Sequence, residues 1–529
     1  MQGRKNYNEK LFHNFQLSDR VRGDNFYRQL REQLDLNFLY KSTETYYSTE
    51  GQESIDPVVF FKLILVGYFE NLNSDRKIID HAGLRLDILF FIGYDIDEAL
   101  PWHSTLSRTR KLYGEQVFVQ LFQQVLKLCI DKGMVCGKRQ AIDSAYIKAN
   151  ASMESLVEKE VLDDAATFSK ELTDNDETST TLSMTNEKKT ISYLRKQKVE
   201  QHHKWKAEKY KGQHKLSQAV MESTDAHSPK FLSNHTHYST TDPDARISVK
   251  PGKPRQLNYS AQVAVDTAHH VITGIGADYS DKRDSQSLAE VVTQTKNNLE
   301  ANGIEMDQVL ADTGYSSGSA LKFLEDNNIP AYIPNFGLYK PEREGFIYNK
   351  EKNQYECERG LKAVLPYKST TTDALGFEKK SYRSSSKVCK HCPLRSECIG
   401  KSDYKKIDDS VHKEYYDRMH LRMQTRKAKR MMRQRSSTVE PVLGTLINFG
   451  GMRRVWTRGI KNANKFMICA GIAYNLKKYM RFIMRNKRKA MSMQIEKSRI
   501  LTKEALFSTI FVLRHFVARY KTKNIFNFL

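Results

Sequence analysis

Three acidic residues stand where the surrounding sequence predicts buried or helical structure. Asp143 lies inside the mostly apolar run 141–147, which is typical of a buried strand. An unpaired carboxylate in such a strand is costly unless a cation or hydrogen-bond donors compensate it. Asp312 ends the apolar run 309–311, and Glu440 precedes helix-periodic apolar residues. If the fold brings them together, the three carboxylates form an oxygen-ligand site suited to Mg²⁺ or Mn²⁺.

Each acid lies in a longer motif, and the order of the motifs is informative. The segments are AIDSAYIKAN at 141–150, LADTGYSSGSAL at 310–321 and TVEPVLGTLINFGGMRRVWTRG at 438–459. They resemble the three acidic motifs of DDE transposases from bacterial insertion sequences. Further blocks similar to that family lie at 54–78, 101–111, 241–266 and 473–479, so the resemblance covers most of the chain.

The resemblance implies an enzyme that cleaves DNA at the ends of a mobile element and transfers the strands into target DNA. Asp143, Asp312 and Glu440 would be its catalytic residues and would hold two divalent ions, Mg²⁺ or Mn²⁺. In this interpretation both ions share Asp143, while Asp312 completes one site and Glu440 the other. Two such ions about 3.5–4 Å apart serve the attacking and the leaving oxygen of a phosphodiester.

The third motif departs from the family at one position. Members commonly have a lysine seven residues after the glutamate, where this chain has Ile447, whereas Arg435 matches the arginine ahead of the glutamate. Basic residues farther along would then position the substrate: Arg453, Arg454, Arg458 or Lys461. Because Pro441 cannot continue a helix, we expect a new helix to begin near Ser437 or Thr438. An acid in a first helical turn is common, so position alone does not distinguish this role for Glu440 from catalysis.

The net charge of +23 over 529 residues favours a polyanionic partner. The chain has no run of about 18 apolar residues and no signal-peptide apolar region at its start, which argues against a membrane protein. Seven unevenly spaced cysteines argue against a secreted disulfide scaffold. We expect a bacterial cytoplasmic protein that associates with the nucleoid when it binds DNA.

Two basic segments are candidates for DNA contact. One ends the helical block 101–111, and the other is the stretch 422–435, which has seven basic residues and no acidic one. The candidate residues are Arg108, Arg110, Lys111, Arg426, Lys427, Arg430, Arg433 and Arg435. The first segment fits a helix-turn-helix-like DNA-binding module, although a helical domain that only packs on the core has the same pattern. The resemblance implies that this region binds the terminal inverted repeats. Because two ends are handled together, the resemblance implies a homodimer.

Four cysteines fall in one predicted insertion. Cys389 and Cys392 form a C-x-x-C pair, and Cys357 and Cys398 complete a possible four-thiolate site for structural Zn²⁺. His391 is a possible substitute ligand, and reduced cysteines that pack as small apolar side chains are the alternative. We expect the other three, Cys129, Cys136 and Cys469, to lie in the core.

Periodicity predicts the order strand, strand, strand, helix, strand, helix, strand from 139 to 334. This order fits an α/β fold, the ribonuclease-H-like mixed sheet that the resemblance also implies, with an N-terminal helical domain and a small cysteine-rich insertion. The predicted N-terminal part, 1–135, is the helical end-binding domain. The core has two parts: 136–334, with a charged insertion at 151–244 that holds a basic helix near 193–212, and 411–485, with Glu440. The cysteine-rich insertion, 335–410, lies between them, and a basic and apolar helical tail, 486–529, ends the chain.

Two other functions fit the same pattern. A transposase-derived regulator would keep the fold and the basic surface but lack chemistry, and the three retained acids count against it. A structure-specific nuclease of the same fold would hydrolyse DNA without joining it. In the TDPDAR segment, Asp242, Asp244 and Arg246 are interpreted as a turn that supports the site.

Overall fold

The computed structural model describes residues 16–48, 50, 54–158, 234, 237–248, 255–337, 339–372 and 378–525. The basic helix predicted near 193–212 and most of the charged insertion lie outside these residues. A short two-stranded sheet, β2 (Leu156–Glu158) with β3 (His237–Ser239), closes the described ends of that insertion. No helix in the described part of the chain has a stretch long and apolar enough to cross a bilayer.

The N-terminal region is helical and is centred on α4 (Pro57–Phe69). The Asp56 side chain accepts hydrogen bonds from the backbone N–H groups of Val58 and Val59, and Pro57 occupies the first turn, as the sequence predicts. Nearly all of α4 is buried, which explains its apolar residues on every side. Around it lie α1 (Leu17–Arg20), α2 (Phe26–Gln33), α3 (Phe38–Thr43), α5 (Asp75–Gly83), α6 (Leu86–Ile92), α7 (His103–Leu112) and α8 (Glu115–Asp131).

A mixed sheet forms the centre of the molecule. Its strands are β1 (Arg139–Lys148), β4 (Arg246–Ser248), β5 (Gln256–Asp266), β6 (Ile272–Tyr279), β7 (Gln308–Leu310) and β8 (Ala331–Tyr332). The order is β4-β5-β1-β7-β8, with β6 also paired to β5. The hairpin β5–β6 runs antiparallel beside β1, whereas β7 and β8 are parallel. This is the ribonuclease-H-like arrangement that the sequence predicts.

The two faces of the sheet bury different side chains. On one face Ala141 and Val263 join a large core shared with the N-terminal helices and with α18 (Ile460–Ile525). On the other face Ile142 and Ala264 pack in a core with α12 (Asp284–Glu300) and α13 (Gly318–Asp326). Alternate residues of a strand point to opposite faces, so this three-layered arrangement follows from the strand pattern.

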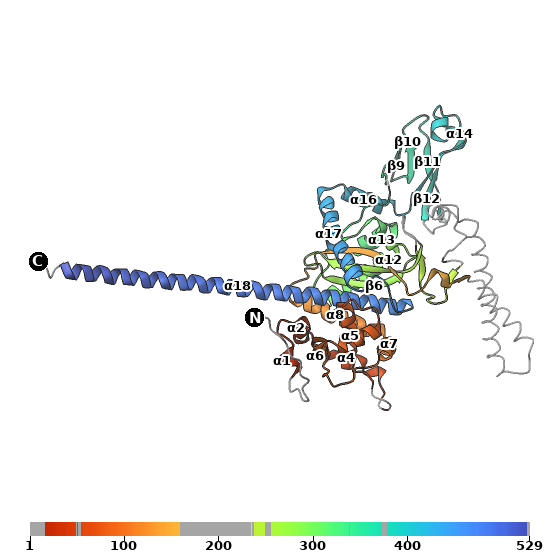
Figure 1. The fold of residues 1–529 in the computed structure, drawn as a ribbon. Helices are drawn as coiled ribbons and strands as arrows, with labels where there is room; N and C mark the ends of the chain where they lie inside the picture. The colour runs from red at the N-terminus through yellow and green to blue at the C-terminus, as the bar shows by residue number, and fades with distance from the viewer. Residues whose placement is uncertain are drawn as a thin grey trace, which may run out of the picture.

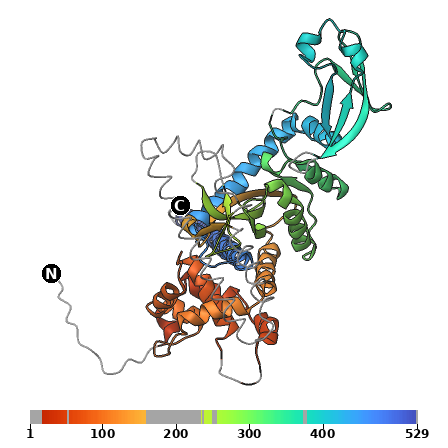
Figure 2. The same ribbon diagram turned by 90° about the vertical axis from the view of Figure 1, so that its right-hand side faces the viewer.

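The cysteine-rich insertion has a sheet of its own, with the antiparallel order β13-β12-β11-β10-β9. The strands are β9 (Phe346–Asn349), β10 (Gln354–Cys357), β11 (Val364–Thr372), β12 (Glu378–Arg383) and β13 (Lys406–Ser410), with α14 (Ser386–Cys389) and α15 (Arg395–Cys398) beside them. Tyr355, Leu365, Tyr382 and Ile407 form its small core. In Figures 1 and 2 this sheet stands at the opposite end of the molecule from the N-terminal helices.

The chain returns to the central sheet through α16 (Lys413–Met423) and α17 (Arg426–Phe449). The prediction that Pro441 starts a new helix is wrong, because α17 continues through it. Pro441 and Ser437 both lie on the exposed side of the helix, so the carbonyl that loses its partner faces water. Buried Val439, Val442 and Leu443 hold α17 to the core on both sides of the proline.

The last element, α18, begins inside the molecule and runs far beyond it (Figure 1). Its first part packs on β6 and α8. Phe507 and Phe511, in the outer part, are 75% and 64% exposed. These side chains therefore do not pack on the core.

Candidate active site

Asp143 and Asp312 lie at matching positions on neighbouring parallel strands. In the pairing of β1 with β7, Ala141 is opposite Leu310, and each aspartate follows two residues later. Neighbouring strands are about 4.8 Å apart, so this register brings the two carboxylates to the same edge of the sheet. The Asp312 side chain accepts a hydrogen bond of 2.9 Å from the backbone N–H of Gly314, which fixes it at the turn after β7.

Arg435 connects Asp143 with Glu440. Its Nη1 donates to Asp143 Oδ2 at 2.9 Å, and its Nη2 donates to Glu440 Oε1 at 3.2 Å. The Arg435 side chain is 12% exposed and that of Asp143 16%, whereas Glu440 is 57% exposed. Helix α17 lies against β1, so the third predicted acid reaches the same place from a different element.

Burial and charge act in opposite directions on Asp143. Burial raises the pKa of its carboxyl above the ordinary value, and the nearby Asp312 charge adds to that rise. The Arg435 guanidinium and the N–H of Ser144 lower the pKa but do not cancel the effect of burial. Asp143 therefore favours a partner with positive charge, which in this structure is Arg435.

The donor set fits a hard divalent cation, because it consists of carboxylates from three elements. The arrangement is nevertheless open. Within the described ranges, no three His, Cys, Asp or Glu side chains are placed so that they could hold a metal ion together. Arg435 occupies the position between Asp143 and Glu440. Ligation of a cation by both acids would therefore require Arg435 to release Asp143.

The predicted DNA-contacting residues divide into exposed and buried ones. The basic residues on the first half of α17 are exposed, and so are those beyond its end: Arg426, Lys427, Arg430, Arg433, Arg453, Arg454, Arg458 and Lys461. On α7, Arg108 and Lys111 are exposed. Because α17 also carries Arg435 and Glu440, its exposed basic residues form a positively charged surface next to the acids.

Arg110 departs from the predicted DNA-contacting role. It is 8% exposed, and its guanidinium makes two hydrogen bonds to Asp75, at 3.0 and 2.6 Å. It also lies over the ring of Trp456, 5.2 Å from the centroid. The periodicity of the short basic block does not distinguish this inward-facing arginine from its exposed neighbours. We therefore exclude Arg110 from the residues expected to contact DNA.

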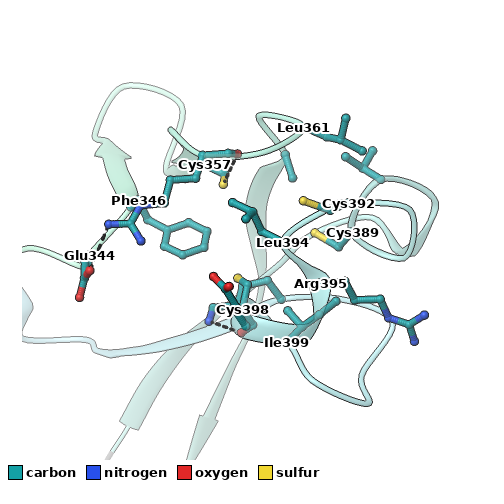
Figure 3. A pocket seen from close by; sticks show the side chains of 16 residues that line it. Glu344, Phe346, Cys357, Leu361, Cys389, Cys392, Leu394, Arg395, Cys398 and Ile399 are labelled. Atoms are coloured by element: carbon teal, nitrogen blue, oxygen red, sulfur yellow. Dashed lines mark hydrogen bonds and ion pairs between the residues drawn. The ribbon is translucent and has the colours of Figure 1, made fainter.

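All four cysteines of the insertion line one cavity of about 310 Å³ (Figure 3). Cys389 and Cys392 lie side by side, and the Cys357 thiol donates to the carbonyl oxygen of Arg359 at 3.0 Å. A Cβ atom at Gly360 would come within 2.5 Å of Cys392 Sγ, so the chain passes close to this thiol. The sulfurs share a cavity but are not gathered around one point.

The structure also places the remaining cysteines and the TDPDAR segment. Cys129 and Cys469 are buried as predicted, but the core prediction for Cys136 is wrong, since it is exposed in the turn before β1. Asp242 is fully buried and accepts hydrogen bonds from the Tyr259 hydroxyl and the Gly459 N–H. Asp244 accepts from the Ile460 N–H at 2.9 Å, so the segment holds the start of α18 and is architectural, as predicted.

A fourth acid near the site was absent from the sequence prediction. Asp284 begins α12, and its carboxylate lies beside that of Asp312 across Gly314. In the sequence it is indistinguishable from the many acids that occupy first helical turns. Only the packing of α12 against the turn after β7 reveals its position.

Two family models match the chain. A transposase domain (DUF772) matches residues 15–112, which form the N-terminal helices up to α7. A transposase DDE domain matches residues 356–480, which include most of the cysteine-rich insertion, Glu440 and the start of α18. A search of curated proteins returned no match. Taken with the mixed sheet and the converging acids, these matches identify the two segments as transposase domains and support a DDE-type transposase.

Proposed function

We propose that this protein cleaves DNA at the ends of a mobile element and transfers the freed strands into target DNA, with Asp143, Asp312 and Glu440 as its catalytic residues. The observation that supports this most is the convergence of three acids from separate elements, two in register on parallel strands and the third linked through Arg435. A divalent metal bound by these acids would activate the attacking oxygen and stabilise the charge on the leaving oxygen.

The chain's own residues have distinct tasks in this proposal. Asp143 and Asp312 are held rigidly by the sheet edge and by the turn after β7, whereas Glu440 is exposed and can adjust. Arg435 neutralises Asp143 until the site is loaded and is then free to contact a phosphate. The exposed basic residues of α17 position the DNA backbone, which gives affinity without sequence preference.

Substitution of single aspartates tests the proposal. Asp143→Asn and Asp312→Asn should abolish both cleavage and strand transfer on DNA that carries the element's terminal inverted repeats, because each removes a metal-ligating charge. Binding to the same DNA in EDTA should be unchanged. Asp307→Asn is a matched control, since this exposed aspartate lies immediately before β7, at the strand end opposite Asp312. A substituted protein that still cuts would refute the assignment.

The products identify the reaction class. Joined products with short duplications of the target sequence would support transposition. Cleavage without joining would instead indicate a nuclease of the same fold, and binding without cleavage a regulator. From the resemblance to the family we expect a dimer that holds two paired ends. The mass of the protein–DNA complex gives the number of chains bound.

We also propose that Cys357, Cys389, Cys392 and Cys398 bind a structural Zn²⁺. Their shared cavity supports this, and thiolate ligands suit zinc. Elemental analysis of the purified protein should give one zinc per chain, and this zinc should be absent from the Cys389→Ser/Cys392→Ser variant. A wild-type protein that contains no zinc and unfolds identically with and without chelator would leave the cysteines as packed thiols.

A further inference from the structure

Asp284 lies closer to the predicted catalytic acids than a helix-start residue needs to. It begins α12, which follows the β5–β6 hairpin and covers one face of the sheet. A Cβ atom built on Gly314 would be 3.0 Å from Asp284 Oδ2 and 3.1 Å from Asp312 Oδ1. Two carboxylate oxygens from different elements therefore flank one point above the turn after β7.

A buried network orients Asp284 towards this point. The Tyr315 hydroxyl, fully buried, donates to Gln262 Oε1 at 2.6 Å, and Gln262 Nε2 faces Asp284 Oδ1 at 3.4 Å. Gln262 is paired with Ser144 in the neighbouring strand, one residue from Asp143. The network thus extends from the turn that carries Asp312 through β5 to Asp284.

The electrostatics of nearby tyrosines show that the acids share one region. Burial raises the pKa of Tyr315, and the charges of Asp284, Asp143 and Asp312 raise it further. Burial also raises the pKa of Tyr146, on the same strand as Asp143, and the charges of Asp284 and, to a smaller extent, Asp281 add to that rise. Negative charges so close to one another repel unless a cation is shared between them.

We propose that Asp284 is a fourth carboxylate of the active site, which together with Asp312 holds the divalent ion on that side of Asp143. This inference rests on the proposed function, since it deepens the description of the same site. Gly314 is part of the arrangement, because any side chain there would enter the space between the two carboxylates.

The test measures metal binding without DNA and without turnover. Mn²⁺ is titrated into the full-length protein, and free Mn²⁺ is followed by electron paramagnetic resonance. Asp284→Asn should weaken Mn²⁺ binding by about 10- to 100-fold, the range found when groups supporting a metal site are removed. Asp284→Glu, which keeps the carboxylate, should recover part of the affinity.

Asp281→Asn is the matched control. It removes the same charge three residues away in the same loop, but its carboxylate lies towards Arg246, at 3.6 Å. This variant should bind Mn²⁺ as the wild type does. An equal loss of affinity in both variants would reveal only a general effect of net charge and would overturn the proposal. Wild-type Mn²⁺ affinity in Asp284→Asn would overturn it as well, even if cleavage were lost.

The proposed function and the role of Asp284 fail differently. If Asp143→Asn and Asp312→Asn abolish cleavage and Mn²⁺ binding while Asp284→Asn binds Mn²⁺ normally, the proposed function stands and the role of Asp284 is wrong. If Asp143→Asn still cuts, the proposed function itself is wrong. Thermal unfolding of each variant shows whether it is folded, and should Asp284→Asn fail to fold, Asp284→Ser, which also suits a helix start, replaces it.

Discussion

At the scale of single residues, the proposed active site is organised by one positive charge among several negative ones. Arg435 is nearly buried and binds both Asp143 and Glu440, so it offsets part of the negative charge of these acids. A guanidinium offers several donors in a rigid plane and suits two carboxylates at once. The same geometry makes Arg435 a competitor of any cation that uses these acids.

Substitution of Arg435 should therefore destabilise the protein, because the buried Asp143 carboxylate is costly without a charged partner. In EDTA, Arg435→Gln should lower the free energy of unfolding by about 1–3 kcal/mol, because Asp143 loses its charged partner. Added Mg²⁺ should stabilise this variant more than the wild type, since no guanidinium has to be displaced. Thermal unfolding with and without Mg²⁺ measures both effects. Arg433→Gln, at an exposed position on the same helix, is the control, and equal Mg²⁺ responses in the two variants would contradict the prediction.

Residue types and motifs were enough to select Asp143, Asp312 and Glu440 as candidates, the first because a carboxylate in an apolar strand is unusual and the last through its motif. They were not enough for Arg435 or Asp284. Arg435 belongs to a basic run in which every member has the same local pattern, and only the packing of α17 on β1 turns it inward. Asp284 has an ordinary helix-start context, and its neighbour across space is distant in sequence.

At the scale of elements, α17 carries both the exposed basic residues and Glu440. Its 24 residues continue through Pro441, although a proline inside a helix removes one backbone hydrogen bond. The sequence rule for proline failed here because it does not include tertiary packing. Buried apolar residues on both sides of the proline keep the helix in one piece, and the carbonyl without a partner lies towards water.

Pro441→Ala should consequently stabilise the protein. Alanine restores the backbone N–H and relieves the ring's crowding, while the unfolded chain gains some freedom, so we expect a net gain of about 1–3 kcal/mol. Urea denaturation gives the change in the free energy of unfolding. An unchanged or lower midpoint would show that Pro441 fits its helix without cost.

The β5–β6 hairpin provides a pH-dependent element. His270, in its turn, has a left-handed backbone with φ of 56°, and burial together with Lys478 and His269 lowers its pKa below 6.5. The unfolded chain then binds the proton more tightly, so stability falls as the pH drops below 6.5. His270→Asn tolerates the same backbone and does not titrate, so it should gain stability relative to the wild type between pH 7.5 and about 5. Melting temperatures across this range test it, and parallel curves would contradict it.

Most of the elements themselves were predictable from periodicity. The order of strands and helices in the central sheet and the α4 start at Asp56 both follow from local pattern and turn residues. The length of α18 does not, because no single helical period of apolar residues runs along its 66 residues. Nor does the exposure of Cys136, which depends on how the turn before β1 meets the sheet.

At the scale of the whole molecule, the basic surface of α17 lies on the same helix as the third acid. Basic side chains that bind phosphates release counterions, so DNA binding should fall steeply with salt. Replacement of Arg426, Lys427, Arg430 and Arg433 by Gln should weaken DNA binding in EDTA. The slope of log K against log salt should become shallower by about 0.9 for each phosphate that is no longer neutralised. Titrations at several salt concentrations measure the slope.

The control for this experiment removes the same charge elsewhere. Lys352, Lys368, Lys387 and Lys390 are exposed on the cysteine-rich insertion, and their joint replacement by Gln lowers the net charge equally. The slope should change less in this variant. Equal changes in the two variants would mean that the overall charge, and not the α17 surface, governs DNA binding.

The N-terminal helices and the central sheet share one continuous core. Lys465 of α18 donates to the carbonyl oxygens of Arg110 and Tyr113, and Tyr68 donates to that of Phe466. A chimaera that joins the N-terminal helices of this protein to the central sheet of a distant relative would therefore have mismatched apolar faces. Such a chimaera would be made in order to change which DNA ends are recognised. We expect such chimaeras to fold only when α8 and the inner half of α18 are taken from the same parent as the N-terminal helices that they contact.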